Sequence, residues 1–278
     1  MKINMHIHSN KSLDGKEDIN KILEKCQKEG IDIVSITDHD TCEAYKNITI
    51  NFPNKIVNGI EADALIGNKT YDFLCYDFNL EEIGKWASNQ YGTIQYRQTK
   101  IYETLLEICK QNNIIIDDHV PYNPDIEYAH NAIYRMIELP NKDYLEKINI
   151  KSPNDFYRET TINENCPLYI DMHIVWPDIK DLVKIIHQNG GKVFLAHPFK
   201  YSKDEDVETL LEYAKQYVDG IEVYNETTKT QTEYLINYAK ENNLLMSVGS
   251  DYHANEKHKD LTTPENDYLT SHIIKWLK

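Results

Sequence analysis

Short apolar runs that end in a histidine or an acidic residue recur five times along this 278-residue chain. The last of them, residues 244–249, leads into Asp251 and His253. The other four lead to the residues His6 and His8, Asp38 and His39, Glu61, and His197. In a parallel α/β sheet or barrel, the carboxyl ends of the strands share one face. We therefore expect these side chains to converge, and such a cluster of imidazoles and carboxylates indicates metal ions.

The spacing of the paired residues supports this interpretation. Side chains alternate along a strand, so His6 and His8 point the same way, as do Asp251 and His253. Apolar residues fill the alternate positions of the first predicted strand, residues 2–8. Alternating polar residues on a strand are often merely solvated, but two histidines are uncommon in that role.

Segments with helical periodicity separate the apolar runs, so the sequence predicts an α/β protein. In the first of these segments, residues 19–29, apolar residues recur on one face, Asp18 can cap the beginning, and Gly30 can end the helix. The alternation of strand and helix resumes at Asp178 and continues to a last helix at about residues 268–277.

A long segment interrupts this alternation. Residues 81–113 are predicted to be helical and another helix is predicted near residues 129–138, in surroundings rich in Asn, Tyr and Pro. We expect a barrel formed by residues 1–80 and 167–278, with residues 81–166 as a mostly helical insertion that covers its mouth.

Composition restricts the partners. A formal net charge of −15 argues against binding of duplex nucleic acid or a membrane surface, although not against a nucleotide or short strand held by metals. The five cysteines form no C-x-x-C pair, which is typical of thiols in a reducing compartment. With no targeting segment and no apolar stretch near ~18 residues, a cytoplasmic protein is expected.

The motifs of the chain, in order, are His6-x-His8, Asp14, Thr37-Asp38-His39, Glu61, Ala196-His197-Pro198 and Gly249-Ser250-Asp251-x-His253. Together they closely resemble the PHP (polymerase and histidinol phosphatase) family of metal-dependent phosphoesterases. The stretch 190–201 and the length are most similar to the TrpH-like subgroup. The resemblance implies a distorted (β/α)7 TIM-like barrel with metals at its C-terminal face.

The resemblance also implies the ligands of two or three divalent metal ions. The first ion would be held by His6, His8, Glu61 and Asp251. The second would share Glu61 and take His197 and Asp72, which stands where many relatives have a histidine. The third would use Asp14, His39 and His253, although Asp14 precedes Gly15 and by its context alone reads as a turn residue. Mixed imidazole and carboxylate ligands favour Mn, Fe or Zn.

Further roles are expected around these ligands. Asp38 is expected to orient an imidazole from behind. Lys200 falls where relatives often have a basic phosphate contact. Relatives tend to carry an arginine in the insertion where this chain reads Tyr128-Ala129-His130-Asn131, so His130 is the expected substrate contact there, with His119 in reserve.

These expectations predict a hydrolase that cleaves phosphate esters of small nucleotide-like substrates. It would be a nucleotide bisphosphate phosphatase or a 5'-3' exonuclease on short single-stranded RNA. Metals ~3.5–4 Å apart would activate the attacking water. Glu61 would bridge them, while Asp14, His39 or His253 assist proton transfer. The alternatives are a histidinol-phosphate phosphatase and a catalytically inactive metal-binding regulatory scaffold; the near-complete ligand set counts against the scaffold.

Overall fold

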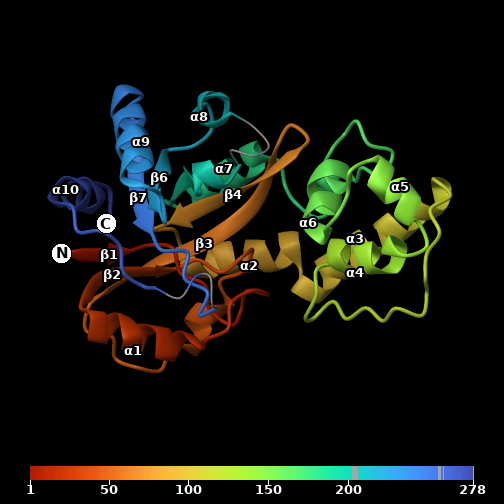
Figure 1. Cartoon of the computed structure of the whole chain (residues 1–278). Helices are drawn as coiled ribbons and strands as arrows, with labels where there is room; N and C mark the ends of the chain where they lie inside the picture. The colour runs from red at the N-terminus through yellow and green to blue at the C-terminus, as the bar shows by residue number, and fades with distance from the viewer. Residues whose placement is uncertain (202–205, 256–257, 259, 278) are drawn as a thin grey trace. The chain divides into compact units, whose positions relative to one another are not determined.

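The computed structural model of the chain describes residues 1–201, 206–255, 258 and 260–277 (Figure 1). The chain forms two compact units. We call the first the barrel unit; it comprises Met1–Ala64, Tyr71–Ser88 and Ile179–Lys278. We call the second the helical unit; it comprises Leu65–Thr70 and Asn89–Asp178. That residues 81–166 cover the barrel mouth stays a prediction.

Seven strands in the described residues form one sheet whose spatial order follows the chain. They are β1 (Lys2–Asn4), β2 (Ile31–Ile36), β3 (Lys55–Ile66), β4 (Lys69–Tyr76), β5 (Lys192–Leu195), β6 (Gly220–Asn225) and β7 (Leu245–Gly249). Strands β1 to β3 are parallel, as are β5 to β7, whereas β4 runs antiparallel to β5. The backbone N–H of Met5 donates to the carbonyl of Val248 at 2.9 Å, so the sheet nearly closes on itself. The predicted α/β barrel is confirmed.

The helices of the barrel unit follow the strands. They are α1 (Ile19–Glu29), α7 (Ile179–Gln188), α8 (Val207–Ala214), α9 (Lys229–Glu241), α10 (Asp267–Trp276) and most of α2 (Leu80–Tyr91). The helical unit contains α3 (Ile94–Gln111), α4 (Ala129–Glu138), α5 (Lys142–Lys147) and α6 (Pro153–Phe156). No helix among the described residues is both long and apolar enough to cross a membrane.

Helix α1 shows why these sequences fold as they do. The side chain of Asp18 accepts a hydrogen bond from the N–H of Asn20 at 2.9 Å, which caps the helix. Gly30 ends it in the left-handed conformation at φ +69°. The apolar face, including Ile22 and Leu23, is fully buried in a core shared with β2. Each such side chain contributes about 1.5–3 kcal/mol. The predicted beginning and end of this helix are confirmed.

Glycines with positive φ refine two sequence predictions. Residues 81–113 are helical as predicted, but Gly92 (φ +63°) separates α2 from α3, and the Thr93 hydroxyl caps α3 by accepting from the N–H of Tyr96. A strand ending at Glu61 was wrong. Strand β3 continues to Ile66, and Gly67 (φ +63°) then turns the chain into β4.

The reversed direction of β4 matters for the site. In a strand that runs opposite to its neighbours, an early residue lies at the edge that receives the carboxyl ends of the others. Asp72 is such a residue: its carbonyl accepts a hydrogen bond from the N–H of Ala196 at 3.0 Å, directly before His197. Asp72 therefore reaches the common face from the beginning of its strand.

Candidate metal centre

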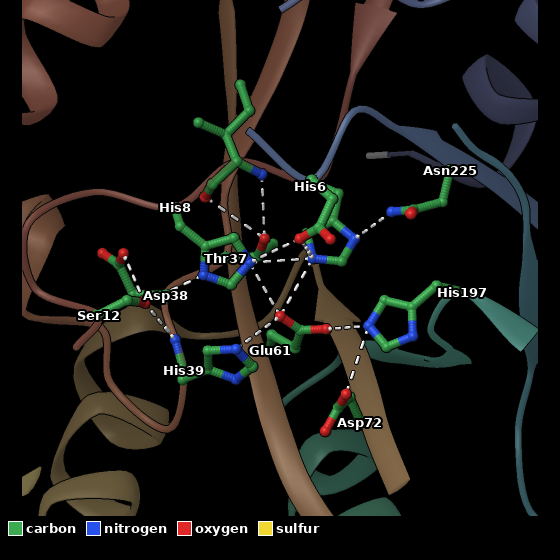
Figure 2. Close-up of polar contacts among 12 residues, drawn as sticks. His6, His8, Ser12, Thr37, Asp38, His39, Glu61, Asp72, His197 and Asn225 are labelled. Carbon is green, nitrogen blue, oxygen red and sulfur yellow. Dashed lines mark hydrogen bonds and ion pairs between the residues drawn. The ribbon is translucent and has the colours of Figure 1, made fainter. Parts of the chain in front are cut away.

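Glu61 lies at the centre of a cluster of histidines and carboxylates in the barrel unit (Figure 2). Its Oε2 atom is 3.1 Å from His6 Nε2 and 2.9 Å from His8 Nε2. Its Oε1 atom is 3.0 Å from the Nε2 atom of His197. The backbone is held to the segment after β2, because Asp40 donates its N–H to the Glu61 carbonyl at 2.8 Å. The two oxygens thus face different histidines, as a bridging carboxylate requires.

Four buried donor atoms form the first group, in the residues His6, His8, Glu61 and Asp251. The Nε2 atoms of His6 and His8 are 3.1 Å apart, and the Asp251 Oδ1 atom lies 3.1 Å and 3.3 Å from them. Strand pairing brings them together, since the N–H of Asp251 donates to the carbonyl of His6 at 2.9 Å.

The second group consists of Glu61, Asp72 and His197. The Nε2 atom of His197 lies 3.3 Å from the Asp72 Oδ2 atom. Tyr201 fixes this aspartate: its hydroxyl accepts from the Asp72 N–H at 2.9 Å and lies 3.0 Å from Oδ2.

The third group consists of His8, Asp14, His39 and His253. The Asp14 Oδ2 atom lies 3.2 Å from His253 Nε2 and 3.7 Å from His39 Nε2. The rings of His8 and His253 stack with centroids 4.1 Å apart. Although its context suggested only a turn, Asp14 thus faces the same cluster.

The charge of these groups fits a cation. Burial alone would lower the pKa of His8, but hydrogen bonds with Asp251 and Glu61 raise it to about 10. Burial would raise the pKa of Glu61, but the neighbouring His6 and His39 hold it well below its usual range. The raised pKa of His8 shows that carboxylates surround the imidazoles, and the lowered pKa of Glu61 shows that its surroundings favour the negative form. Ligands of a tetrahedral ion at ~2.0–2.2 Å would lie roughly 3.3–3.6 Å apart, close to the spacings of the first group, so the donor set suits bound metal.

Groups behind the histidines set their orientation. The Ser12 hydroxyl donates to Asp38 Oδ1 at 3.1 Å, accepts from the His39 N–H at 2.9 Å, and lies 3.0 Å from His8 Nδ1. Because this hydroxyl donates its hydrogen bond to Asp38, it can only accept one from the Nδ1–H group of His8. The Nε2 atom of His8 then carries no proton and is free to bind a metal. Asp38 thus contacts the His8 ring through the Ser12 hydroxyl, which is consistent with its expected role behind the ligands.

A pocket of about 200 Å³ opens onto the cluster, and its lining belongs to the barrel unit. It is lined by Asp14, His39, Glu61, Asp72, His197, Lys200, Asp251, His253, Asn255 and His258. Lys200 pairs with Asp251 through its ammonium group. His258 lines this pocket as well.

The sequence interpretation missed Tyr201, Asn255 and Glu222 as residues of this region. Glu222 is a lone charge inside the apolar strand β6, and that pattern was a usable signal. Tyr201 and Asn255 carry no comparable signal, since their importance depends on which strands are neighbours.

The two histidines predicted to bind substrate lie in the helical unit. His119 is exposed beside Asp117 and Asp118. The His130 ring contacts Tyr157 at a tilt of 34°, with ring centroids 4.6 Å apart, and desolvation lowers its pKa to about 4. Their roles toward substrate stay predictions.

Comparisons with known proteins agree with this geometry. The sequence profile of the PHP domain matches residues 4–223. A 5'-3' exoribonuclease of Haemophilus influenzae is 22% identical over 91% of this chain and 90% of its own length. A phosphoribosyl 1,2-cyclic phosphate 1,2-diphosphodiesterase of Eggerthella lenta is 21% identical over 90% of this chain and 93% of its own.

A solved structure shares the fold. The protein, from Bifidobacterium adolescentis, is described as a candidate metal-dependent phosphoesterase. It superposes with a TM-score of 0.60 at 21% identity, covering 99% of this chain and 96% of its own. At this identity the likeness establishes the barrel architecture.

Proposed function

Since the chain belongs to the PHP domain family and is a hydrolase of phosphate ester bonds, we propose that it acts on small nucleotide-like substrates. Nucleotide bisphosphates and the 5' ends of short single-stranded RNA are the proposed substrates. The names of the two curated relatives, an exoribonuclease and a diesterase of a ribosyl phosphate, support this range.

The observation that carries the proposal is that three groups of donor atoms share Glu61 or His8 beside one pocket. We propose that His6, His8, Glu61 and Asp251 hold one ion, that Glu61, Asp72 and His197 hold a second, and that Asp14, His39 and His253 complete a third position. When bound, Mn, Fe or Zn ions would neutralise phosphate oxygens and lower the pKa of water.

The side chains of the pocket supply the remaining functions. Among its lining residues described here, none is a serine, threonine or cysteine, so water is the proposed nucleophile. Lys200 offers a positive charge to the phosphate. Burial by itself would lower the pKa of its ammonium group, but the neighbouring Asp251 carboxylate outweighs burial and raises it. When the third position is empty, Asp14, His39 or His253 would exchange protons with the leaving oxygen, and of these Asp14 and His39 are partly exposed.

Chromatographic analysis of the products tests the proposal across a panel of substrates with Mn, Fe or Zn added: phosphomonoesters would release inorganic phosphate, RNA would release mononucleotides, and a cyclic phosphodiester would open to a monoester. The panel contains adenosine 3',5'-bisphosphate, a short 5'-phosphorylated RNA, a cyclic phosphodiester and histidinol phosphate. We expect turnover of the first two, with two or three metals per chain by elemental analysis. Selective turnover of histidinol phosphate would favour that alternative. Metal binding without any turnover would favour the regulatory scaffold, and fewer than one metal per chain would overturn the proposal.

A further inference from the structure

Glu222 is a buried carboxylate that belongs to none of the three donor groups. It lies in the middle of β6, about 1% exposed, between β5 and β7. A buried charge is costly unless its oxygens are hydrogen-bonded. The identity of its partners therefore shows what the residue does.

Each oxygen of Glu222 holds a different histidine. The Oε1 atom lies 3.0 Å from His6 Nδ1. The Oε2 atom accepts the backbone N–H of His197 at 2.8 Å. Figure 2 shows that the Asn225 amide, on the same strand, also points to His6, at 3.4 Å. One carboxylate thus contacts a histidine of the first group through its ring and a histidine of the second through its backbone.

The residues around this carboxylate are closely packed. A Cβ atom at Gly249 on β7 would lie 2.8 Å from Glu222 Oε1 and 2.1 Å from the Cβ atom of His6. Only glycine fits there, so the backbone of β7 packs directly against both His6 and the Glu222 carboxylate. The contact is enforced by the sheet and does not depend on a mobile side chain.

The chemistry of the two contacts is specific. A carboxylate acceptor at Nδ1 keeps the proton on that nitrogen, so the Nε2 atom of His6 faces Glu61 and Asp251 as an acceptor. His197 has φ +27°, and its Nδ1 atom has no hydrogen-bond partner among the described residues. Its backbone bond to Glu222 is therefore the anchor that holds this uncommon conformation.

We propose that Glu222 is a positioning residue that orients His6 and His197 together, so that its loss weakens both the first and the second metal position. The inference rests on the proposed metal centre. It predicts that two ions, which share Glu61 but take different histidines, respond to one side chain that contacts neither ion.

The test is Glu222→Gln. An amide has a single acceptor oxygen, so it can serve the His6 ring or the His197 N–H, while its NH₂ group opposes the other donor. We expect the affinities for Mn at both positions to fall by about 10–100-fold, as is typical when the partner behind a ligating histidine is lost. Titration followed by Mn electron paramagnetic resonance measures both affinities and the coupling between the ions.

The chain contains a matched control at the other end of the same strand. Asp219 precedes β6, and its Oδ2 atom lies 2.7 Å from His187 Nε2 and accepts the N–H of Val193, on β5, at 2.9 Å. Like Glu222, this carboxylate contacts one histidine ring and accepts one backbone N–H, but it belongs to none of the three donor groups. Asp219→Asn should therefore cost comparable stability and leave Mn affinity unchanged.

Each outcome is decisive. Equal Mn affinity in Glu222→Gln and wild type, or an equal loss in Asp219→Asn, would overturn the inference. Wild type that binds no Mn would instead refute the proposed metal centre. If Glu222→Gln does not fold, ¹⁵N chemical shifts of the histidine rings in zinc-loaded wild type decide the matter. We expect the proton of His6 on Nδ1, and a proton on Nε2 would contradict the positioning role.

Discussion

Two histidines, His6 in the barrel unit and the half-buried His130 in the helical unit, have opposite electrostatic surroundings. In the barrel unit, His6 is fully buried, yet the charges of Glu61, Glu222 and Asp251 outweigh burial and raise its pKa well above the usual value. In the helical unit, His130 packs between the aromatic rings of Tyr128 and Tyr157, and burial lowers its pKa to about 4.

This contrast separates a site for cations from a packing or stacking site. A buried imidazole among carboxylates lies in a region of concentrated negative charge, which a bound metal cation would neutralise. A buried imidazole among aromatic rings stays neutral and offers a flat face. The following experiments test whether the barrel unit binds metal and the helical unit recognises substrate, or whether the helical unit has only a structural role.

The largest effect is expected for Glu61→Gln. Both oxygens of this carboxylate face metal-binding candidates, so the amide removes charge where two cations would need it. We expect kcat to fall by at least about 100-fold, the loss typical of removing one group that stabilises charge in the transition state.

Steady-state kinetics at saturating Mn measures this loss. The exposed Glu233 on α9 provides the matched control, since Glu233→Gln changes the same formal charge at the surface. Near wild-type turnover of Glu61→Gln would show that Glu61 does not bridge metals.

Asp72 should give the next largest effect. Asp72→Ala is expected to weaken one metal more than the other, by about 10-fold, and Asp72→His to shift preference toward Zn because imidazole is the softer donor. Tyr201→Phe removes the hydroxyl that holds Asp72 and should act in the same direction, but less. Competitive metal titrations measure all three; if they match wild type, Asp72 is only a strand residue.

A pH effect on stability should mark His130. Its folded pKa lies below the unfolded value of 6.5, so the unfolded chain binds the proton more readily. The contribution of His130 to the free energy of unfolding should therefore fall as the pH decreases from about 6.5 toward 4, by about 1–2 kcal/mol at most. Urea unfolding at pH 7 and pH 5 measures the change, which should shrink in His130→Phe and persist when the exposed His119 is replaced. An unchanged pH dependence in His130→Phe would contradict the assignment.

The smallest effect concerns substrate selection. If the helical unit recognises the substrate, His130→Ala should raise KM a few-fold with little change in kcat, because a contact equal in ground and transition states affects binding. Lys200→Ala should act in the same direction, and the two effects should be less than additive if both residues contact one phosphate. A nucleotide and a non-nucleotide phosphate should be compared. Unchanged kcat/KM in His130→Ala and His119→Ala for both would make the helical unit a structural cover.

The sequence predicted most of the barrel because its strands have a local pattern, a short apolar run that ends in a polar residue. Each apolar run with a polar end became a strand or its continuation, and the spacing of Asp251 and His253 places both beside His8. The helix boundaries at Asp18 and Gly30 followed from capping chemistry.

What the sequence could not predict depends on which strands become neighbours. Glu61 looked like the end of a strand, since nothing local signals that β3 continues past it. The direction of β4 follows from the turn at Gly67, and without it Asp72 could not be placed. Tyr201 gains its role only when β4 and β5 pair, because that pairing sets its hydroxyl beside Asp72.

The closure of the sheet between its first and last strands has a consequence for the order of synthesis. Met5 bonds to Val248, and Asp251 bonds to His6, so the first donor group joins residues from the beginning and the end of the chain. A nascent chain still on the ribosome carries His6, His8 and Glu61 without the carboxylate that completes the group. The proposed first donor group is therefore complete only once the residues that follow β7 have been synthesised and β7 has joined the sheet.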